Sequence, residues 1–85
     1  MNSGENRVSY TAKKTRHKYR ELYRVTFSDG IKKTIGLQPN GDWHLYITDD
    51  CFNGRAFSNM DAVAQYAHEI AIKEKEWLKT HWVTV

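Results

Sequence analysis

Apolar and polar residues alternate along the middle of the chain, which is the period of a β-strand with one buried face. Segments rich in turn-forming residues interrupt this alternation, and each ends in glycine, which takes a positive φ without steric cost. These turns are Ser28-Asp29-Gly30, Pro39-Asn40-Gly41 and Phe52-Asn53-Gly54. We therefore expect an antiparallel meander of four strands, the last one short, near residues 18–28, 31–38, 42–50 and 55–57.

The apolar pattern also selects the length of the turns. A two-residue turn at the first glycine would place Phe27 opposite Lys32 and mix the two faces. A three-residue loop, a type I turn closed by a left-handed glycine, pairs Phe27 with Ile31 instead. Applied along the chain, this rule predicts these further pairs: Tyr23 with Ile35, Leu37 with Trp43, Ile35 with Leu45, Cys51 with Arg55 and Asp49 with Phe57.

This register divides the side chains between two faces of the sheet. One face is apolar, apart from Glu21, Lys33 and Asp49 near the strand ends, and we expect it to form the core. Its members are Tyr19, Tyr23, Val25, Phe27, Ile31, Ile35, Leu37, Trp43, Leu45, Ile47 and Phe57. The opposite face is polar, basic and lightly aromatic. Its members are Arg20, Leu22, Arg24, Thr26, Lys32, Thr34, Gly36, His44, Tyr46 and Thr48.

A helical pattern then predicts one long helix from about residue 59 to 81. Ser58 stands three residues before Asp61, a spacing typical of a capping box. An apolar stripe along the helix should cover the apolar face of the sheet, which gives a two-layer α+β domain. The stripe comprises Val63, Tyr66, Ala67, Ile70, Trp77, Leu78 and His81.

The predicted helix is longer than the sheet that it covers. It spans roughly 34 Å at 1.5 Å per residue, whereas strands of six or seven residues span about 22 Å. We therefore expect its last turns to extend beyond the sheet, with Trp77 and Trp82 on them. These aromatics either pack internally, Trp82 with Tyr10 and Tyr19, or contact a partner, because tryptophan is favoured in interface hot spots.

Charge is unevenly distributed over the 85 residues, whose formal net charge is +3. Residues 1–24 carry seven basic and two acidic side chains, so the positive excess lies in this segment. We expect residues 1–16 to form a flexible basic arm and residues 17–85 to form a single α+β domain. Such an arm either contacts nucleic acid, because Lys and Arg displace counterions from phosphate, or only keeps the protein soluble.

Several functional classes are disfavoured. No apolar run has the length of a membrane span, and a lone cysteine, Cys51, favours a reducing, cytoplasmic setting. Asp49 and Asp50 project to opposite faces of a strand and form no acid/base pair. The histidines lack zinc-site spacing, and we expect them on the surface: His17, His44, His68 and His81. We therefore expect no enzyme, no cofactor, no membrane contact and no small-molecule substrate.

The polar face of the sheet and the basic arm carry residue types that suit nucleic acid. Arginine and lysine contact phosphates or guanine edges, and threonine and tyrosine add hydrogen bonds. A sheet can enter the major groove of duplex DNA. The predicted contacts are Lys13, Lys14, Arg16, Lys18, Arg20, Arg24, Lys32, Thr34, His44 and Tyr46. The alternative is an ordinary polar surface, since a one-sided antiparallel sheet exposes such residues in any case.

Two local patterns carry a family resemblance. Gly41-Asp42-Trp43 precedes residues 44–47 (HLYI), and Phe57 precedes a helix with Asp61-Ala62, Tyr66 and Ala71. Over about residues 31–72 this layout resembles the three-stranded-sheet DNA-binding domains of tyrosine recombinases (phage integrases) and of the plant ethylene-response type. The resemblance implies a sheet face in the major groove, with contacts at Lys32, Thr34, His44 and Tyr46. The chain departs from that pattern in its long extra first strand, its offset helix aromatic and its Asp49-Asp50 pair.

A second hypothesis belongs to another class of protein. Small single-domain, cysteine-poor proteins with a meander and one helix are also typical of phage or mobile-element inhibitors and adaptors, which bind a host protein or defence complex in the host cytoplasm. Such a protein would use a free strand edge or the aromatic end of its helix. The residues expected to contact the host protein are Trp77 and Trp82.

Overall fold

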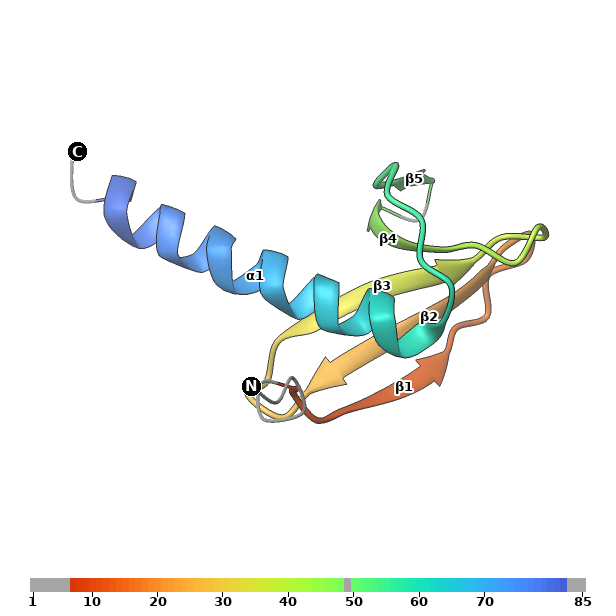
Figure 1. Cartoon of the computed structure of the whole chain (residues 1–85), viewed down its shortest axis with the longest axis horizontal. Coiled ribbons are helices and arrows are strands. Elements are labelled where there is room, and N and C mark those ends of the chain that lie inside the picture. The colour runs from red at the N-terminus through yellow and green to blue at the C-terminus, as the bar shows by residue number, and fades with distance from the viewer. Residues whose placement is uncertain (1–6, 49, 83–85) are drawn as a thin grey trace.

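Five antiparallel strands pair in chain order, and one long helix covers one face of the sheet (Figure 1). The structure is a computed structural model that describes residues 7–48 and 50–82, except for the side chains of residues 80–82. Its elements are β1 (Tyr10–Lys14), β2 (Glu21–Phe27), β3 (Lys32–Leu37), β4 (Trp43–Thr48), β5 (Cys51–Phe52) and α1 (Met60–Trp82). The predicted two-layer α+β fold is confirmed, with five strands in place of the expected four.

The first two turns have the predicted three-residue form. Phe27 donates its N–H to the carbonyl of Ile31 at 2.8 Å, and the loop closes at Gly30 with a φ of +92°. The second loop closes at Gly41 with a φ of +95°. The register that follows is the expected one: Tyr23 opposite Ile35, Ile35 opposite Leu45 and Leu37 opposite Trp43.

The third turn differs from the prediction. The chain reverses sooner, so that Thr48 pairs with Cys51 and Tyr46 with Phe52 across a register shift. The pairing of Cys51 with Arg55 is therefore wrong, and Asp49 lies outside the described residues. A second reversal follows at Asn53, whose side-chain oxygen accepts the N–H of Arg55 at 2.8 Å. This turn brings Phe57, expected opposite Asp49, to an isolated bridge with Trp43.

The N-terminal segment is partly a strand. Tyr10–Lys14 forms β1 and pairs with β2 along its whole length, from Tyr10 opposite Phe27 to Lys14 opposite Tyr23. The expectation of a flexible arm over residues 1–16 is therefore wrong for this stretch, while residues 1–6 lie outside the described part. The Tyr10 ring meets the Phe27 ring edge-on at 5.8 Å between centroids. Through this contact, β1 packs against the core.

Side chains of α1 hold in place the segment that leads into β1. The Gln65 side-chain amide hydrogen-bonds both the N–H and the carbonyl of Val8 at 3.0 Å, as a neighbouring strand would. The Tyr10 hydroxyl donates to Asp61 at 2.9 Å, and Arg7 forms an ion pair with the same carboxylate. Burial raises the pKa of Asp61, but hydrogen bonds from Arg7 and Tyr10 outweigh it and leave this pKa lowered. Burial and the hydrogen bond to Asp61 raise the pKa of Tyr10 above 10.0.

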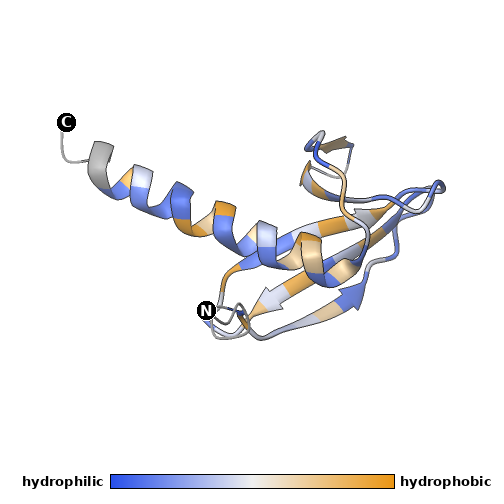
Figure 2. Cartoon of the chain, viewed as in Figure 1, coloured by the Kyte–Doolittle hydropathy of each residue, from blue (hydrophilic) through white to orange (hydrophobic). Residues whose placement is uncertain are grey.

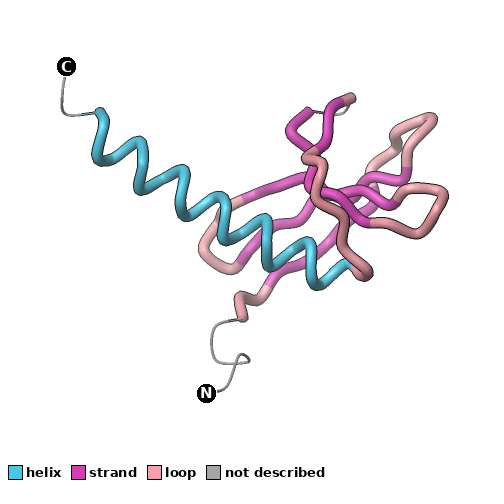
Figure 3. The backbone as a smooth tube through the Cα atoms, turned by 45° about the horizontal axis from the view of Figure 1, so that its top comes forward, coloured by secondary structure: helices cyan, strands magenta, loops and turns pink. Residues whose placement is uncertain are grey.

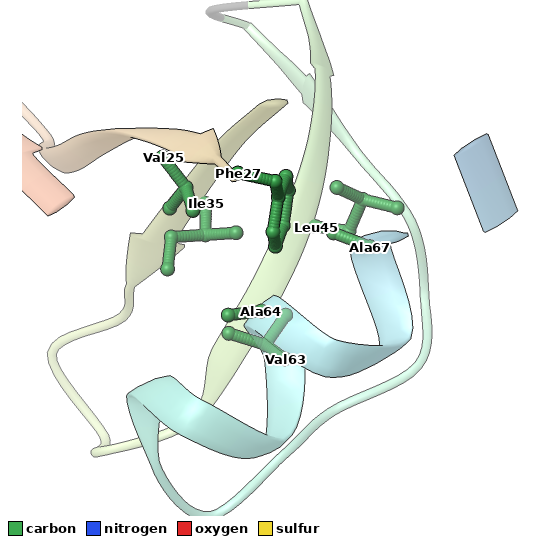
Figure 4. Packing of buried hydrophobic residues seen from close by; sticks show 7 residues of the cluster. All are labelled: Val25, Phe27, Ile35, Leu45, Val63, Ala64 and Ala67. Atoms are coloured by element: carbon green, nitrogen blue, oxygen red, sulfur yellow. The ribbon is translucent and has the colours of Figure 1, made fainter. Parts of the chain in front are cut away.

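The core lies between the predicted sheet face and the first half of α1 (Figure 4). The strands contribute Val25, Phe27, Ile35 and Leu45, and the helix contributes Val63, Ala64 and Ala67. Three expected core residues of the sheet lie outside it: Tyr19, Ile47 and the half-buried Leu37. Tyr19, in the loop before β2, is 84% exposed, and Ile47 is 69% exposed. Ile47 is exposed because the pairing of β3 with β4 ends at Thr34 and Tyr46, and β4 then continues without that neighbour.

The helix begins at Met60 with a cap other than the predicted one. The side-chain oxygen of Asn59 accepts the N–H of Ala62 at 2.8 Å, which satisfies one of the free donors of the first turn. Ser58 lies outside this cap and accepts a hydrogen bond from the Asn59 amide instead.

The last turns of α1 extend past the sheet, as its length predicted (Figure 3). Figure 2 shows apolar bands on this end that alternate with hydrophilic ones. Trp77 and Leu78 are 57% and 55% exposed, and the side chain of Trp82 lies outside the described part. Tyr10 packs on Phe27 and Tyr19 is exposed, so these two residues do not pack on one another, and the alternative that Trp82 packs internally with them lies outside the described residues.

Candidate nucleic-acid interface

The outer face is the side of the sheet turned away from α1. Residues directly opposite one another in an antiparallel pair share a face, so the register determines its membership. From β1 to β4 it comprises Thr11, Lys13, Leu22, Arg24, Thr26, Lys32, Thr34, Gly36, His44 and Tyr46. Of the predicted contact residues, the structure brings Lys13, Arg24, Lys32 and Thr34 together here.

Two cations lie side by side on this face. Lys13 of β1 is directly opposite Arg24 of β2, and Thr34 of β3 continues the same row. Like charges at directly opposed positions destabilise a sheet. Lys32 lies one step along, opposite Thr26. Two neighbouring like charges of this kind oppose folding. An anion bound beside them would relieve their repulsion, so the pair is suited to anion binding.

The acidic residues lie elsewhere. Strands β1 to β4 contain one of them, Glu21, which is on the helix side, where its carboxylate accepts the Tyr23 hydroxyl at 2.6 Å. This hydrogen bond raises the pKa of Tyr23, together with burial of the tyrosine hydroxyl. The ion pairs that join described side chains each include a residue of α1: Arg7–Asp61, Lys33–Glu74, His68–Asp29 and Lys73–Glu69. Within the described part of the chain, the cations of the outer face form no ion pair.

His44 and Tyr46 lie on the outer face but are buried, with 7% and 5% of their surface exposed. β5 folds back along β4 so that the Phe52 ring lies 4.5 Å from the His44 ring and 5.2 Å from the Tyr46 ring, between centroids. The His44 Nδ1–H donates to the carbonyl of Asn53 at 2.9 Å. Neither side chain is placed to contact DNA, and the expectation that His44 is a surface histidine is wrong.

The Tyr46 ring lies across Gly36. A Cβ atom at that glycine would stand 2.4 Å from Tyr46 Cε1 and 2.7 Å from Leu22 Cδ2, much closer than real contacts allow. The Tyr46 hydroxyl accepts a hydrogen bond from the Gln38 side-chain amide at 2.6 Å. These residues form a small second layer of packing on the outer face, which leaves the exposed cations toward β1, β2 and the start of β3.

The loop of residues 15–20 closes one end of the outer face. His17 organises it, because its Nδ1 accepts the N–H groups of Tyr19 and Arg20 at 3.2 and 3.1 Å. The Thr15 N–H donates to the carbonyl of Leu22 at 2.9 Å and ties the loop to β2. Between loop and sheet is a hollow of about 420 Å³, which we call the loop pocket. Its lining residues are Thr15, Arg16, His17, Lys18, Arg24 and Thr34.

The remaining predicted contacts lie apart from this group. Lys14 is opposite Tyr23 and therefore belongs to the helix side of the sheet. Arg20 lines a separate hollow of about 510 Å³ together with Glu21, Gln38 and Tyr46. The sequence interpretation missed Thr15 and His17, which belong to the loop pocket. The available signal was the alternation from Val8 to Lys13, which is typical of a strand and would have placed the next residues in a turn.

Other chemistry finds little support in the described residues. Nowhere among residues 7–48 and 50–79 do three His, Cys, Asp or Glu side chains come together as metal ligands would. Cys51 is exposed on β5. No helix in the described part of the chain has a stretch long and apolar enough to cross a bilayer.

Comparisons with protein-family models, with curated proteins and with solved structures found no match to this chain. The resemblance to integrase-type DNA-binding domains therefore stays a prediction.

Proposed function

We propose that this protein is a non-enzymatic nucleic-acid-binding protein that binds duplex DNA through its outer face and the 15–20 loop. The observation that carries the proposal is the direct opposition of Lys13 and Arg24, which form no ion pair with any residue that the structure describes. Cations arranged in this way attract phosphates and release the counterions that surround DNA. The cytoplasm, where a phage-encoded protein would meet host DNA, is the proposed setting.

The proposed binding tolerates different sequences. The exposed groups of the outer face are lysine, arginine and threonine, which position a protein on phosphates. The side chains that sequence analysis had expected to add base contacts, His44 and Tyr46, are buried beneath Phe52. We therefore expect similar affinities for A·T-rich and G·C-rich duplexes, because phosphate contacts alone carry no direct sequence information.

A charge-matched pair of variants tests the proposal. Lys13→Gln/Arg24→Gln/Lys32→Gln removes three cations from the outer face, and Lys73→Gln/Lys75→Gln/Lys79→Gln removes three exposed cations from α1. Duplex titrations at two or more salt concentrations give the affinity and the slope of log K against log salt. The first variant should bind much more weakly and with a flatter slope, by about 0.9 for each lost phosphate contact. Equal effects of the two variants, or no binding by the wild type at low salt, would contradict the proposal.

A second candidate function is a protein-binding inhibitor or adaptor. The observation that favours it is the exposure of Trp77 and Leu78 on the part of α1 beyond the sheet, because exposed aromatics often anchor protein interfaces. Its test is a nuclease-treated pull-down with the wild type and with Leu78→Ser. A stoichiometric host protein that the wild type retains and Leu78→Ser releases would support it, and the absence of any such protein would oppose it.

A further inference from the structure

The loop pocket contains the imidazole of His17, which can donate a hydrogen bond to a ligand. Because His17 Nδ1 accepts two backbone N–H groups, the neutral ring carries its hydrogen on Nε2. Nδ1 is therefore occupied by hydrogen bonds within the loop, and the Nε2–H group can donate a hydrogen bond to a ligand. The hydrogen bond from the His17 N–H to Thr15 Oγ1, at 3.4 Å, holds the neighbouring hydroxyl in the same turn.

Cationic side chains from two elements line this pocket. Arg16 and Lys18 come from the loop, and Arg24 comes from β2. Thr15 and Thr34 add hydroxyl groups to the lining, and none of its described residues is acidic. Lys13, opposite Arg24 in the adjacent strand, adds a fourth positive charge nearby. The pocket thus combines three cationic side chains, two hydroxyls and one imidazole donor around about 420 Å³.

The geometry points to a binding site for a terminal phosphate of a nucleic-acid strand in the loop pocket. This inference rests on the proposed function, since it names the part of the DNA that the pocket takes. An internal phosphodiester carries one negative charge, whereas a phosphomonoester carries about −1.5 to −2 at pH 7 and has three strong acceptor oxygens. Three converging cations with additional donors match the monoester better. The volume also admits the sugar attached to it.

The site would therefore favour a 5′-phosphorylated end over a 5′-hydroxyl end of the same duplex. Charge-assisted hydrogen bonds to phosphate are about twice as strong as neutral ones, so we expect roughly fivefold to tenfold tighter binding of the phosphorylated duplex at low salt. Salt should reduce this preference, because the pocket is open to solvent.

Two variants change the chemistry of the loop pocket and are designed to leave the fold intact. His17→Asn keeps an acceptor for the backbone N–H groups two and three residues on, as asparagine does in turns, and removes the Nε2–H donor. Arg16→Gln removes an exposed cation of the pocket lining. The control, Lys73→Gln, removes an exposed cation of α1. Circular-dichroism melting checks that each variant folds.

The experiment compares binding of 3′-labelled duplexes that differ only in a 5′-phosphate or 5′-hydroxyl group. A preference for the phosphate that His17→Asn and Arg16→Gln abolish, and that Lys73→Gln retains, is the expected result. Equal affinity for both duplexes would overturn the inference and leave the proposed function standing. If neither duplex binds at low salt, the proposed function fails, and an NMR titration with inorganic phosphate then tests the pocket alone. Shifts concentrated at residues 15–18 would support it, and unchanged spectra would overturn it.

Discussion

Lys13 and Arg24 lie directly opposite one another on adjacent strands of the sheet, on the face that the helix leaves uncovered. Their repulsion should lower the stability of the free protein, and bound phosphate should relieve it. Lys13→Gln is therefore expected to raise the free energy of unfolding by about 0.5 kcal/mol and to weaken duplex binding. Urea unfolding and a duplex titration measure the two effects, and a variant that loses both stability and affinity would contradict this account.

Gly36 provides the space that the Tyr46 ring occupies on the outer face. A methyl group at this position would stand within 2.7 Å of both Tyr46 and Leu22. Overpacking of this kind typically costs about 1–3 kcal/mol, and we expect a loss of that size for Gly36→Ala in urea unfolding. Gly54→Ala is the control, because a Cβ there meets nothing within 4 Å. Similar losses in the two variants would argue against the packing of Tyr46 across Gly36.

Gln65 joins α1 to the segment that leads into β1 through two hydrogen bonds to Val8. Gln65→Ala leaves both backbone groups of Val8 without this partner, and we expect a loss of about 1–2 kcal/mol in unfolding free energy. Hydrogen exchange should show faster exchange for β1 amides than in the wild type. Unchanged exchange in β1 would mean that pairing with β2 alone holds this strand.

The N-terminus of α1 allows a direct comparison of two capping residues. Asn59 accepts the N–H of Ala62, whereas Ser58 contacts only the Asn59 amide. Asn59→Ala should therefore lower the free energy of unfolding by about 1 kcal/mol, and Ser58→Ala should change it little. The reverse order in urea unfolding would restore Ser58 as the cap.

Stability should fall in acid partly through Asp29. The hydrogen bond from His68 Nε2, at 2.7 Å, and the N–H of Ile31 lower the pKa of the Asp29 carboxyl below 3.8. A carboxyl with a lowered pKa in the folded state contributes stability above its unfolded pKa and loses it as the pH falls through the folded value. Asp29→Asn should therefore weaken the loss of stability below pH 3.8. Asp61, whose pKa is also lowered, should preserve part of the acid-induced loss of stability in this variant. An identical acid dependence of the wild type and Asp29→Asn would contradict the role of Asp29.

Local patterns in the sequence determined the centre of the fold. Alternation along β2, β3 and β4, together with left-handed glycines at 30 and 41, specified two hairpins and their register. The register decided which face was apolar, and the spacing from Val63 to Ala67 decided that a helix covers it. These features depend on neighbours a few residues apart, so the chain itself carries the information. Five of the predicted contacts, Arg24, Lys32, Thr34, His44 and Tyr46, lie on the outer face as a result.

Only the tertiary structure decided which parts of each face are covered. β1 forms because the segment meets β2 and is held by α1 residues more than fifty positions away. His44 and Tyr46 are buried because β5 returns over them, and Ile47 is exposed because β4 continues past its pairing with β3. The alternation of apolar and polar residues indicates on which side of its own strand a residue lies. Coverage of that side depends on contacts between distant segments, which form only when the whole chain has folded.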